Sequence, residues 1–191
     1  IMRIAVSGSA GVGKTTLAGR LAEGLRLAFI PEHYELFFDA PGKFNSPPPV
    51  LARWFFEVLE AKRVRELAAR TFVVDRCPID LFNLWVAKGV AAQAKDTARF
   101  HAVCRSYCAD YDFVVIPPWG EIPLTPLDRP TGRQRRVLNP WVQLRNHAAI
   151  LGLARLWLPP ERVIELPAAI TDVRARIEFV ADRVRSINPL F

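Results

Sequence analysis

Long hydrophobic runs and cysteines are scarce in this chain of 191 residues. No apolar run approaches the ~20 residues that a membrane-spanning helix needs, and the stretch at 148–158 is interrupted by Arg155. The first apolar strand begins almost at once, so we expect no secretory signal peptide. Only three cysteines are present, an odd number. We therefore expect a cytoplasmic protein with reduced thiols and no membrane association.

Internal repeats, low-complexity tracts and linker-like segments are also lacking, so we predict a single domain over residues 1–191. Hydrophobic residues make up 51% and charged residues 24% of the chain, which is ordinary globular composition. The formal net charge of +7 suits a polyanionic partner such as nucleic acid. A nucleotide site alone also recruits arginine and lysine, so the charge leaves both kinds of partner open.

The sequence that organises the chain is Gly-Ser-Ala-Gly-Val-Gly-Lys-Thr at residues 8–15, which fits the phosphate-binding pattern G-x-x-x-x-G-K-[ST]. It follows a β-prone run at 2–7 and precedes a helical pattern at 16–22, as the pattern requires. The glycines allow close backbone approach, and successive N–H groups at a helix N-terminus face an anion. Lys14 is expected to reach the β- and γ-phosphates, and the Thr15 hydroxyl to bind Mg²⁺. The expected ATP-binding residues are Gly8, Ser9, Ala10, Gly11, Val12, Gly13, Lys14, Thr15, Thr16 and, from a later segment, Arg129.

Strand and helix patterns alternate along the rest of the chain. Apolar runs predict further strands at 27–31, 71–75, 112–117 and 162–166. Apolar residues at helical spacing predict helices at 14–25, 50–70, 78–94, 95–109, 140–158 and 171–187. Such alternation is typical of a parallel sheet with helices on both faces. We therefore predict a three-layer α/β fold with a doubly wound, five-stranded parallel sheet.

Chemically competent side chains come directly after predicted strands, where ligands bind in open parallel sheets. Glu32 follows the second strand and could accept a proton from an attacking hydroxyl. Asp75 ends the third strand, where it could hold Mg²⁺ directly or through water, and Arg76 could contact a transferring or acceptor phosphate. The alternatives are an exposed acid for Glu32 and a structural Asp–Arg pair for the other two. Asp80 is interpreted only as a favourable acid near a helix N-terminus.

The segment 119–138 is polar and rich in proline and arginine, and we predict that it forms a lid. A planar guanidinium can bind two oxygens of a phosphoryl group, and a mobile flap can close over ATP. Arg129 and Arg133 are the expected contacts, alongside Arg135 and Arg136. The alternative is a solvated basic loop.

Together these motifs resemble the P-loop nucleoside and nucleotide kinases, in particular deoxynucleoside kinases, thymidylate kinases and related small AAA-type ATPase/kinase domains. The resemblance rests on the phosphate loop, the Pro-Glu pair after the second strand, the Asp-Arg pair after the third and the arginine-rich flap. It implies that Glu32 is the general base. It also aligns Asp75-Arg76-Cys77 with the Glu-Arg-Ser of deoxynucleoside kinases and the Asp-Arg-Tyr/His of thymidylate kinases. Cys77 departs from both patterns, and the region around Arg53, Trp54 and Glu57 lacks the Gln that those kinases favour.

Aromatic side chains after the second strand could stack on an acceptor base, although such residues are more often core. Trp54 leads this group, with Phe37, Phe38 and Phe44. The expected catalytic residues are Glu32, Lys14, Arg76 and Arg133, and the expected metal ligands are Thr15 and Asp75. The expected substrate contacts are Glu32, Trp54, Arg53, Arg76 and Phe37.

Two weaker signals point elsewhere. The sequence Asp-Ala-Pro-Gly at 39–42 resembles the D-x-x-G of GTPases, but no Asn-Lys-x-Asp guanine signature is present. His101, Cys104 and Cys108 share one helical face, where packing is favoured over metal binding because no fourth ligand is apparent.

The sequence thus predicts an ATP- and Mg²⁺-dependent kinase that phosphorylates a hydroxyl of a nucleoside-like acceptor. One alternative is a DNA kinase acting on a hydroxyl such as that of a hydroxymethylated pyrimidine in phage-type DNA. Another is a nucleotide-dependent switch or ATPase module.

Overall fold

The computed structural model describes residues 1–32, 46–124 and 138–187. Its sheet has five strands in the order β2-β3-β1-β4-β5, and every neighbouring pair is parallel. The predicted parallel α/β architecture is therefore confirmed. The strands are β1 (Arg3–Val6), β2 (Ala28–Ile30), β3 (Phe72–Asp75), β4 (Phe113–Ile116) and β5 (Val163–Glu165).

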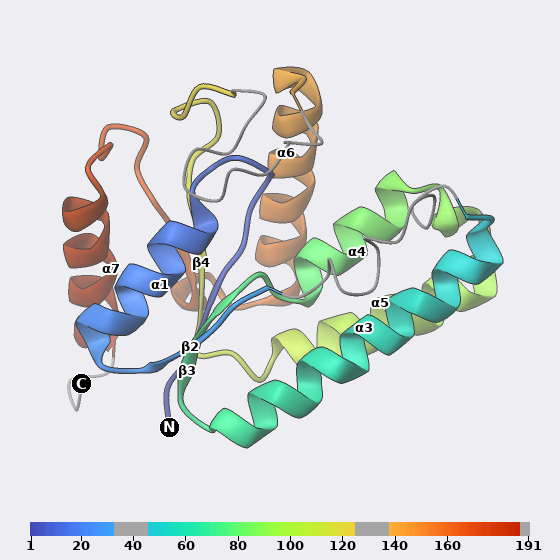
Figure 1. Cartoon of the computed structure of the whole chain (residues 1–191), viewed down its shortest axis with the longest axis horizontal. Helices are drawn as coiled ribbons and strands as arrows, with labels where there is room; N and C mark the ends of the chain where they lie inside the picture. The colour runs from blue at the N-terminus through green and yellow to red at the C-terminus, as the bar shows by residue number, and fades with distance from the viewer. Residues whose placement is uncertain (33–45, 125–137, 188–191) are drawn as a thin grey trace.

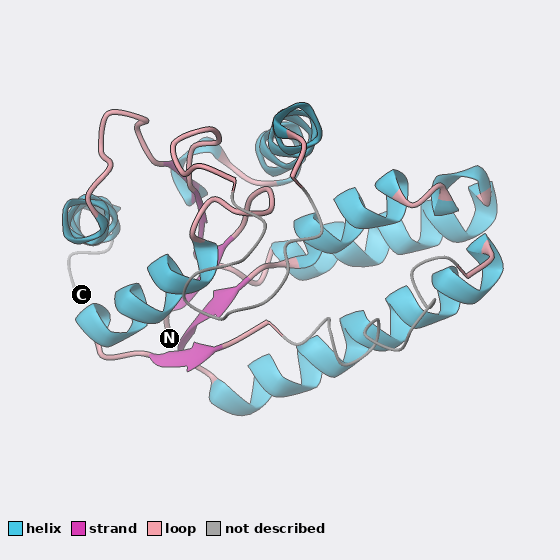
Figure 2. Cartoon of the chain, turned by 45° about the horizontal axis from the view of Figure 1, so that its top comes forward, coloured by secondary structure: helices cyan, strands magenta, loops and turns pink. Residues whose placement is uncertain are grey.

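Helices cover both faces of the sheet (Figure 1, Figure 2). The α-helices described are α1 (Lys14–Leu25), α3 (Pro48–Ala69), α4 (Pro78–Ala87), α5 (Ala94–Cys108), α6 (Pro140–Trp157) and α7 (Val173–Ile187). Within the described residues, two short 3₁₀ helices, η2 (Val90–Ala92) and η3 (Pro160–Arg162), join longer elements. Among the described residues, no helix is both long and apolar enough to cross a membrane.

The central strands are apolar on both sides because each side contacts a separate core. In β1, Ala5 belongs to the cluster formed with α3, α4, α5 and α6. Its neighbours Ile4 and Val6 belong to the cluster formed with α1 and α7. This alternation follows from the two-residue period of a strand. It gives the molecule its three layers, with α1 and α7 on one side of the sheet (Figure 1).

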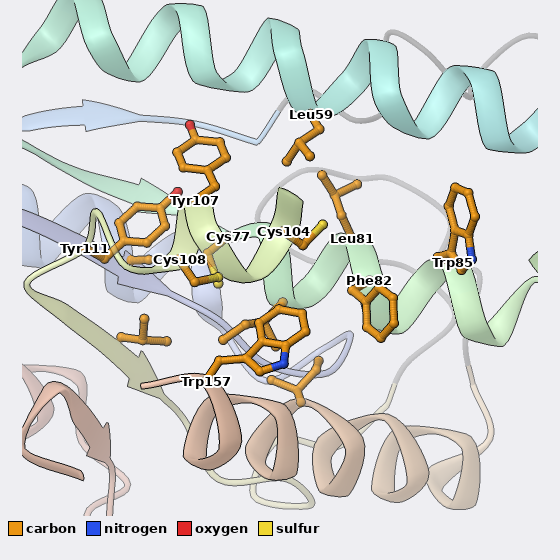
Figure 3. Packing of buried hydrophobic residues seen from close by; sticks show 14 of the residues in the cluster. Leu59, Cys77, Leu81, Phe82, Trp85, Cys104, Tyr107, Cys108, Tyr111 and Trp157 are labelled. Atoms are coloured by element: carbon orange, nitrogen blue, oxygen red, sulfur yellow. The ribbon is translucent and has the colours of Figure 1, made fainter. Parts of the chain in front are cut away.

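The larger core is rich in aromatic side chains and holds all three thiols (Figure 3). The rings of Trp85 and Phe100 stack with centroids 4.4 Å apart. Cys77, Cys104 and Cys108 are fully buried in the same cluster. The ring of His101 on α5 makes edge-on contacts with Phe82 and Trp157. Among the described residues, no three His, Cys, Asp or Glu side chains are grouped so as to hold a metal ion.

One predicted helix is wrong in length. The pattern at 78–94 predicted a continuous helix, but α4 ends at Ala87. Gly89 adopts a left-handed conformation with φ of 74° and starts the 3₁₀ turn η2. Glycine accepts this backbone without a steric penalty, so it ends the helix although the apolar pattern continues.

Candidate active site

The phosphate-binding loop joins the carboxyl end of β1 to the first turn of α1. Gly13 immediately precedes α1 with φ of 78°, a left-handed conformation that side chains disfavour. A Cβ atom at this position would also lie 3.1 Å from Cδ1 of Ile122. Ile122 belongs to the first part of the predicted lid, so the described start of that segment lies against the loop. Both constraints explain why glycine precedes the lysine.

Lys14 is buried within the loop. Its Nζ donates a hydrogen bond of 2.6 Å to the carbonyl oxygen of Ser9. The pKa of Lys14 is lowered to about 8, mainly by burial and also by the positive charge of Arg76, while nearby carboxylates oppose the shift. The loop therefore holds an ammonium group that lacks a full counter-charge, which suits the binding of a phosphate.

Thr15 and Asp75 form the oxygen-rich side of the site. Thr15 Oγ1 donates a hydrogen bond of 2.5 Å to Asp75 Oδ2. The other carboxylate oxygen of Asp75, Oδ1, is buried and has no hydrogen-bond partner among the described residues. Burial raises the pKa of Asp75, whereas the charges of Arg76 and Lys14 lower it. A hydroxyl oxygen beside an incompletely satisfied carboxylate is a fitting donor set for Mg²⁺, with further oxygens from a nucleotide and water.

Arg76 links two carboxylates at the carboxyl edge of the sheet. Its Nε donates to Glu32 Oε2 at 2.9 Å, and its Nη1 lies 3.5 Å from Asp80 Oδ1. The backbone of Arg76 is left-handed, with φ of 69°, and its N–H donates to the carbonyl of Val6 at 2.9 Å. The structure therefore places Glu32, Arg76 and Asp80 in one ion-pair network between β2 and α4.

Asp80 contributes more than the helix-capping charge expected from the sequence. Its carboxylate accepts hydrogen bonds from Ser7 Oγ at 2.7 Å, Cys77 N at 2.9 Å and Gly8 N at 3.2 Å. The bond from Cys77 is part of a capping box at the start of α4. That spacing was visible in the sequence, but the contacts with Ser7 and Gly8 span more than seventy residues. The contacts of Asp80 with Ser7 and Gly8 were therefore not predicted from the sequence.

Gln143 is a second contributor that the sequence did not indicate. It is buried on α6, and its Nε2 donates a hydrogen bond of 2.7 Å to the carbonyl of Ala10 in the loop. The two residues are 133 positions apart, and no motif surrounds Gln143. The loop is thus held by hydrogen bonds to both Gln143 of α6 and Asp80 of α4.

The residues predicted to contact the acceptor are described only in part. Arg53 forms an ion pair of 3.2 Å with Glu57 on the exposed surface of α3. Trp54 is partly buried and packs against the larger core. The other predicted contacts lie outside the described residues: Phe37, Phe38, Phe44, the Asp-Ala-Pro-Gly sequence at 39–42, Arg129, Arg133, Arg135 and Arg136.

Comparisons with known proteins agree with this architecture. A family model described as an AAA domain matches residues 3–140. No curated protein matches the chain.

Several solved structures share the fold. A NadR protein in complex with NR is 21% identical with a TM-score of 0.67, covering 97% of this chain and 51% of that one. A deoxyadenosine kinase from M. mycoides with bound dATP is 15% identical with a TM-score of 0.64, covering 96% and 100%. A thymidylate kinase from Ehrlichia chaffeensis is 16% identical with a TM-score of 0.63, covering 96% and 98%. The present chain thus spans about half the length of the NadR protein. At these identities the likeness establishes the fold.

Proposed function

The chain belongs to the AAA domain family, and from that premise we propose that it is a P-loop kinase. It transfers the γ-phosphoryl group of ATP, with Mg²⁺, to a hydroxyl of a nucleoside-like acceptor. Residues 1–191 form one catalytic domain in this proposal, with the lid at 119–138.

The observation that carries the proposal is the convergence of a donor half and an acceptor half at one edge of the sheet. Lys14 and the loop N–H groups form the donor half, with Thr15 and Asp75 as the ligands for Mg²⁺. Arg76 and Glu32 form the acceptor half and contact each other at 2.9 Å. A module that only binds nucleotide has no need of this second half.

The residues supply positioning and charge, which provide most of the catalysis in phosphoryl transfer. Lys14 neutralises the β- and γ-phosphates, and Arg76 contacts the transferring group. Glu32 accepts the proton of the attacking hydroxyl. A carboxylate base favours a hydroxyl acceptor, because a phosphate oxygen needs no deprotonation at neutral pH. The proposal also assigns phosphate contacts to Arg129 and Arg133, and acceptor contacts to Phe37, Arg53 and Trp54.

The structural neighbours support a nucleoside-like acceptor. The NadR protein was solved in complex with NR, and the deoxyadenosine kinase was solved with dCMP and dCDP, with dATP and with dCTP. These ligands were bound by the neighbouring proteins and not by this chain. They define the panel of acceptors with which this chain should first be tested.

A hydroxyl on DNA is the second candidate acceptor, favoured by the net charge of +7. Several arginines of the described surface are already paired, including Arg20 with Glu23 and Arg174 with Glu178. This pairing weakens the argument for a DNA-binding face. A nucleotide-dependent switch, the third candidate, would leave the Glu32–Arg76 pair without a role.

The test is transfer of radiolabelled γ-phosphate from ATP to nucleosides, nucleotides, plain DNA and hydroxymethyl-containing DNA. We expect transfer to a nucleoside-type hydroxyl, and loss of transfer in Lys14→Met without loss of folding. Transfer to DNA alone, falling steeply with salt, would select the second candidate. Slow ATP hydrolysis with no phosphorylated acceptor would contradict the kinase proposal.

A further inference from the structure

We propose that Asp80 is a positioning residue for phosphoryl transfer, holding the phosphate-binding loop and Arg76 in one fixed register. This inference rests on the proposed kinase function. The inference goes beyond that function because it assigns a role to a side chain that the proposed function places in contact with neither ATP nor the acceptor substrate.

The two oxygens of the Asp80 carboxylate divide their contacts in the same way. Oδ2 accepts from Ser7 Oγ at 2.7 Å and from Cys77 N at 2.9 Å. Oδ1 accepts from Gly8 N at 3.2 Å and lies 3.5 Å from Arg76 Nη1. Each oxygen therefore joins one group that follows β1 to one group that follows β3.

The position of Asp80 makes this link rigid. Its side chain is 1% exposed, and it lies in the first turn of α4, one turn after Arg76. The backbone of Arg76 is held left-handed between its own N–H bond to Val6 and the start of α4. A non-glycine residue keeps such a backbone only where its surroundings enforce it. Asp80 supplies part of that enforcement and directs the Arg76 guanidinium toward Glu32.

Only a carboxylate can satisfy these four donors together. An ionised aspartate is purely an acceptor with two equivalent oxygens, whereas the asparagine amide replaces one acceptor with a donor. Asp80→Asn would therefore turn an N–H group toward one of the two pairs of donors. The loop and Arg76 would lose their common anchor while side-chain volume is nearly unchanged.

The experiment is a double-mutant cycle of Asp80→Asn and Arg76→Ala, with kcat, the KM of the acceptor and the Kd of ATP measured for each protein. The acceptor used is the substrate identified by the radiolabelled-phosphate transfer experiment described above. Asp96→Asn is the matched control, because Asp96 lies in the first turn of α5, outside the site. We expect Asp80→Asn to lower kcat by about 10–100-fold in the wild-type protein. In the Arg76→Ala variant, the same substitution should lower kcat by less than about 3-fold. Asp96→Asn should leave kcat within about 2-fold.

Equal losses in both backgrounds would overturn the inference, because Asp80 would then act on the loop or the fold without Arg76. An unchanged kcat in Asp80→Asn would overturn it as well. If Asp80→Asn does not fold, the cycle is run with Ser7→Ala, which removes one of the four donors, and the same coupling decides. Wild-type protein that transfers to no acceptor would refute the kinase function and this inference together. If the wild type transfers phosphate but the Asp80 and Arg76 substitutions show no coupling, this inference is refuted and the kinase function is not.

Discussion

Arg76 and Glu32 lie 44 residues apart in the sequence and form an ion pair of 2.9 Å at the carboxyl edge of the sheet. Both side chains are partly buried, with 26% and 19% of their surfaces exposed. The proposed base is thus charge-paired with the arginine proposed to contact the transferring group. In the proposed reaction, phosphate competes with Glu32 for Arg76, so the carboxylate is released as the donor and acceptor come together.

Glu32→Gln is expected to lower kcat by about 10²–10⁴-fold, because an amide cannot take the proton of the attacking hydroxyl. The Kd of ATP should change by less than about 3-fold, since Glu32 belongs to the proposed acceptor half. Rapid-quench transfer and equilibrium nucleotide binding measure the two quantities. Glu23→Gln, in an exposed pair with Arg20, is the control. Unchanged turnover in Glu32→Gln would remove the base assignment.

The depressed pKa of Lys14 predicts a pH dependence of stability in the absence of nucleotide. Its pKa falls from 10.5 to about 8, so the folded state binds the proton less tightly than the unfolded chain. Below pH 8 the buried charge costs the folded state about 3 kcal/mol, and this cost is relieved as the pH rises from about 8 to 10.5. Denaturant unfolding should show this rise, and Lys14→Met should lack it.

ATP binding should raise the pKa of Lys14, because phosphate supplies the missing counter-charge. Between about pH 8 and 10, binding should therefore take up a substantial fraction of one proton. Calorimetry in two buffers of different ionisation enthalpy measures the uptake. Identical binding enthalpies in both buffers would contradict the depressed pKa.

Gln143→Ala is expected to weaken ATP binding by about 3–10-fold, because the loop loses its hydrogen bond to α6 and the Ala10 carbonyl is left unsatisfied. Fluorescence titration with a nucleotide analogue measures the change. Asn146→Ala on the same helix, where Asn146 bonds to Arg145, is the control and should have little effect. If Gln143→Ala binds ATP as tightly as Asn146→Ala and the wild type, the hydrogen bond from α6 does not stabilise the loop for ATP binding.

Lys62→Met should lower the free energy of unfolding by about 3–5 kcal/mol, because it leaves the Glu66 carboxylate buried without its cation. Lys62 Nζ lies 2.6 Å from Glu66 Oε1, both side chains are 4% exposed, and Tyr111 donates to Glu66 at 2.7 Å. Chemical denaturation measures the loss. Combining Lys62→Met with Glu66→Leu should recover most of it.

The exposed pair of Arg174 and Glu178 provides the comparison, since Arg174→Ala should cost less than about 1 kcal/mol. A loss of similar size in Lys62→Met would show that the buried pair has little influence on stability.

Much of the candidate site could be predicted from the sequence because its phosphate-binding loop is local. The phosphate-binding loop occupies eight consecutive residues between a strand and a helix, and Asp75 follows an apolar run that is typical of a buried strand. The length of α4 could not be found in the same way. Its apolar pattern continues past Ala87, and the backbone of Gly89 ends the helix.

The sequence alone determined the alternation of strands and helices, the loop that follows β1, and the presence of acids and arginines after the next strands. These features depend on neighbouring residues and on the periods of helix and strand, which a single chain displays directly. The tertiary structure alone decided that Asp80 accepts hydrogen bonds from Ser7 and Gly8, and that Gln143 donates one to Ala10. Those contacts join residues 72 to 133 positions apart, and only the packing of the helices on the sheet brings them within hydrogen-bonding distance.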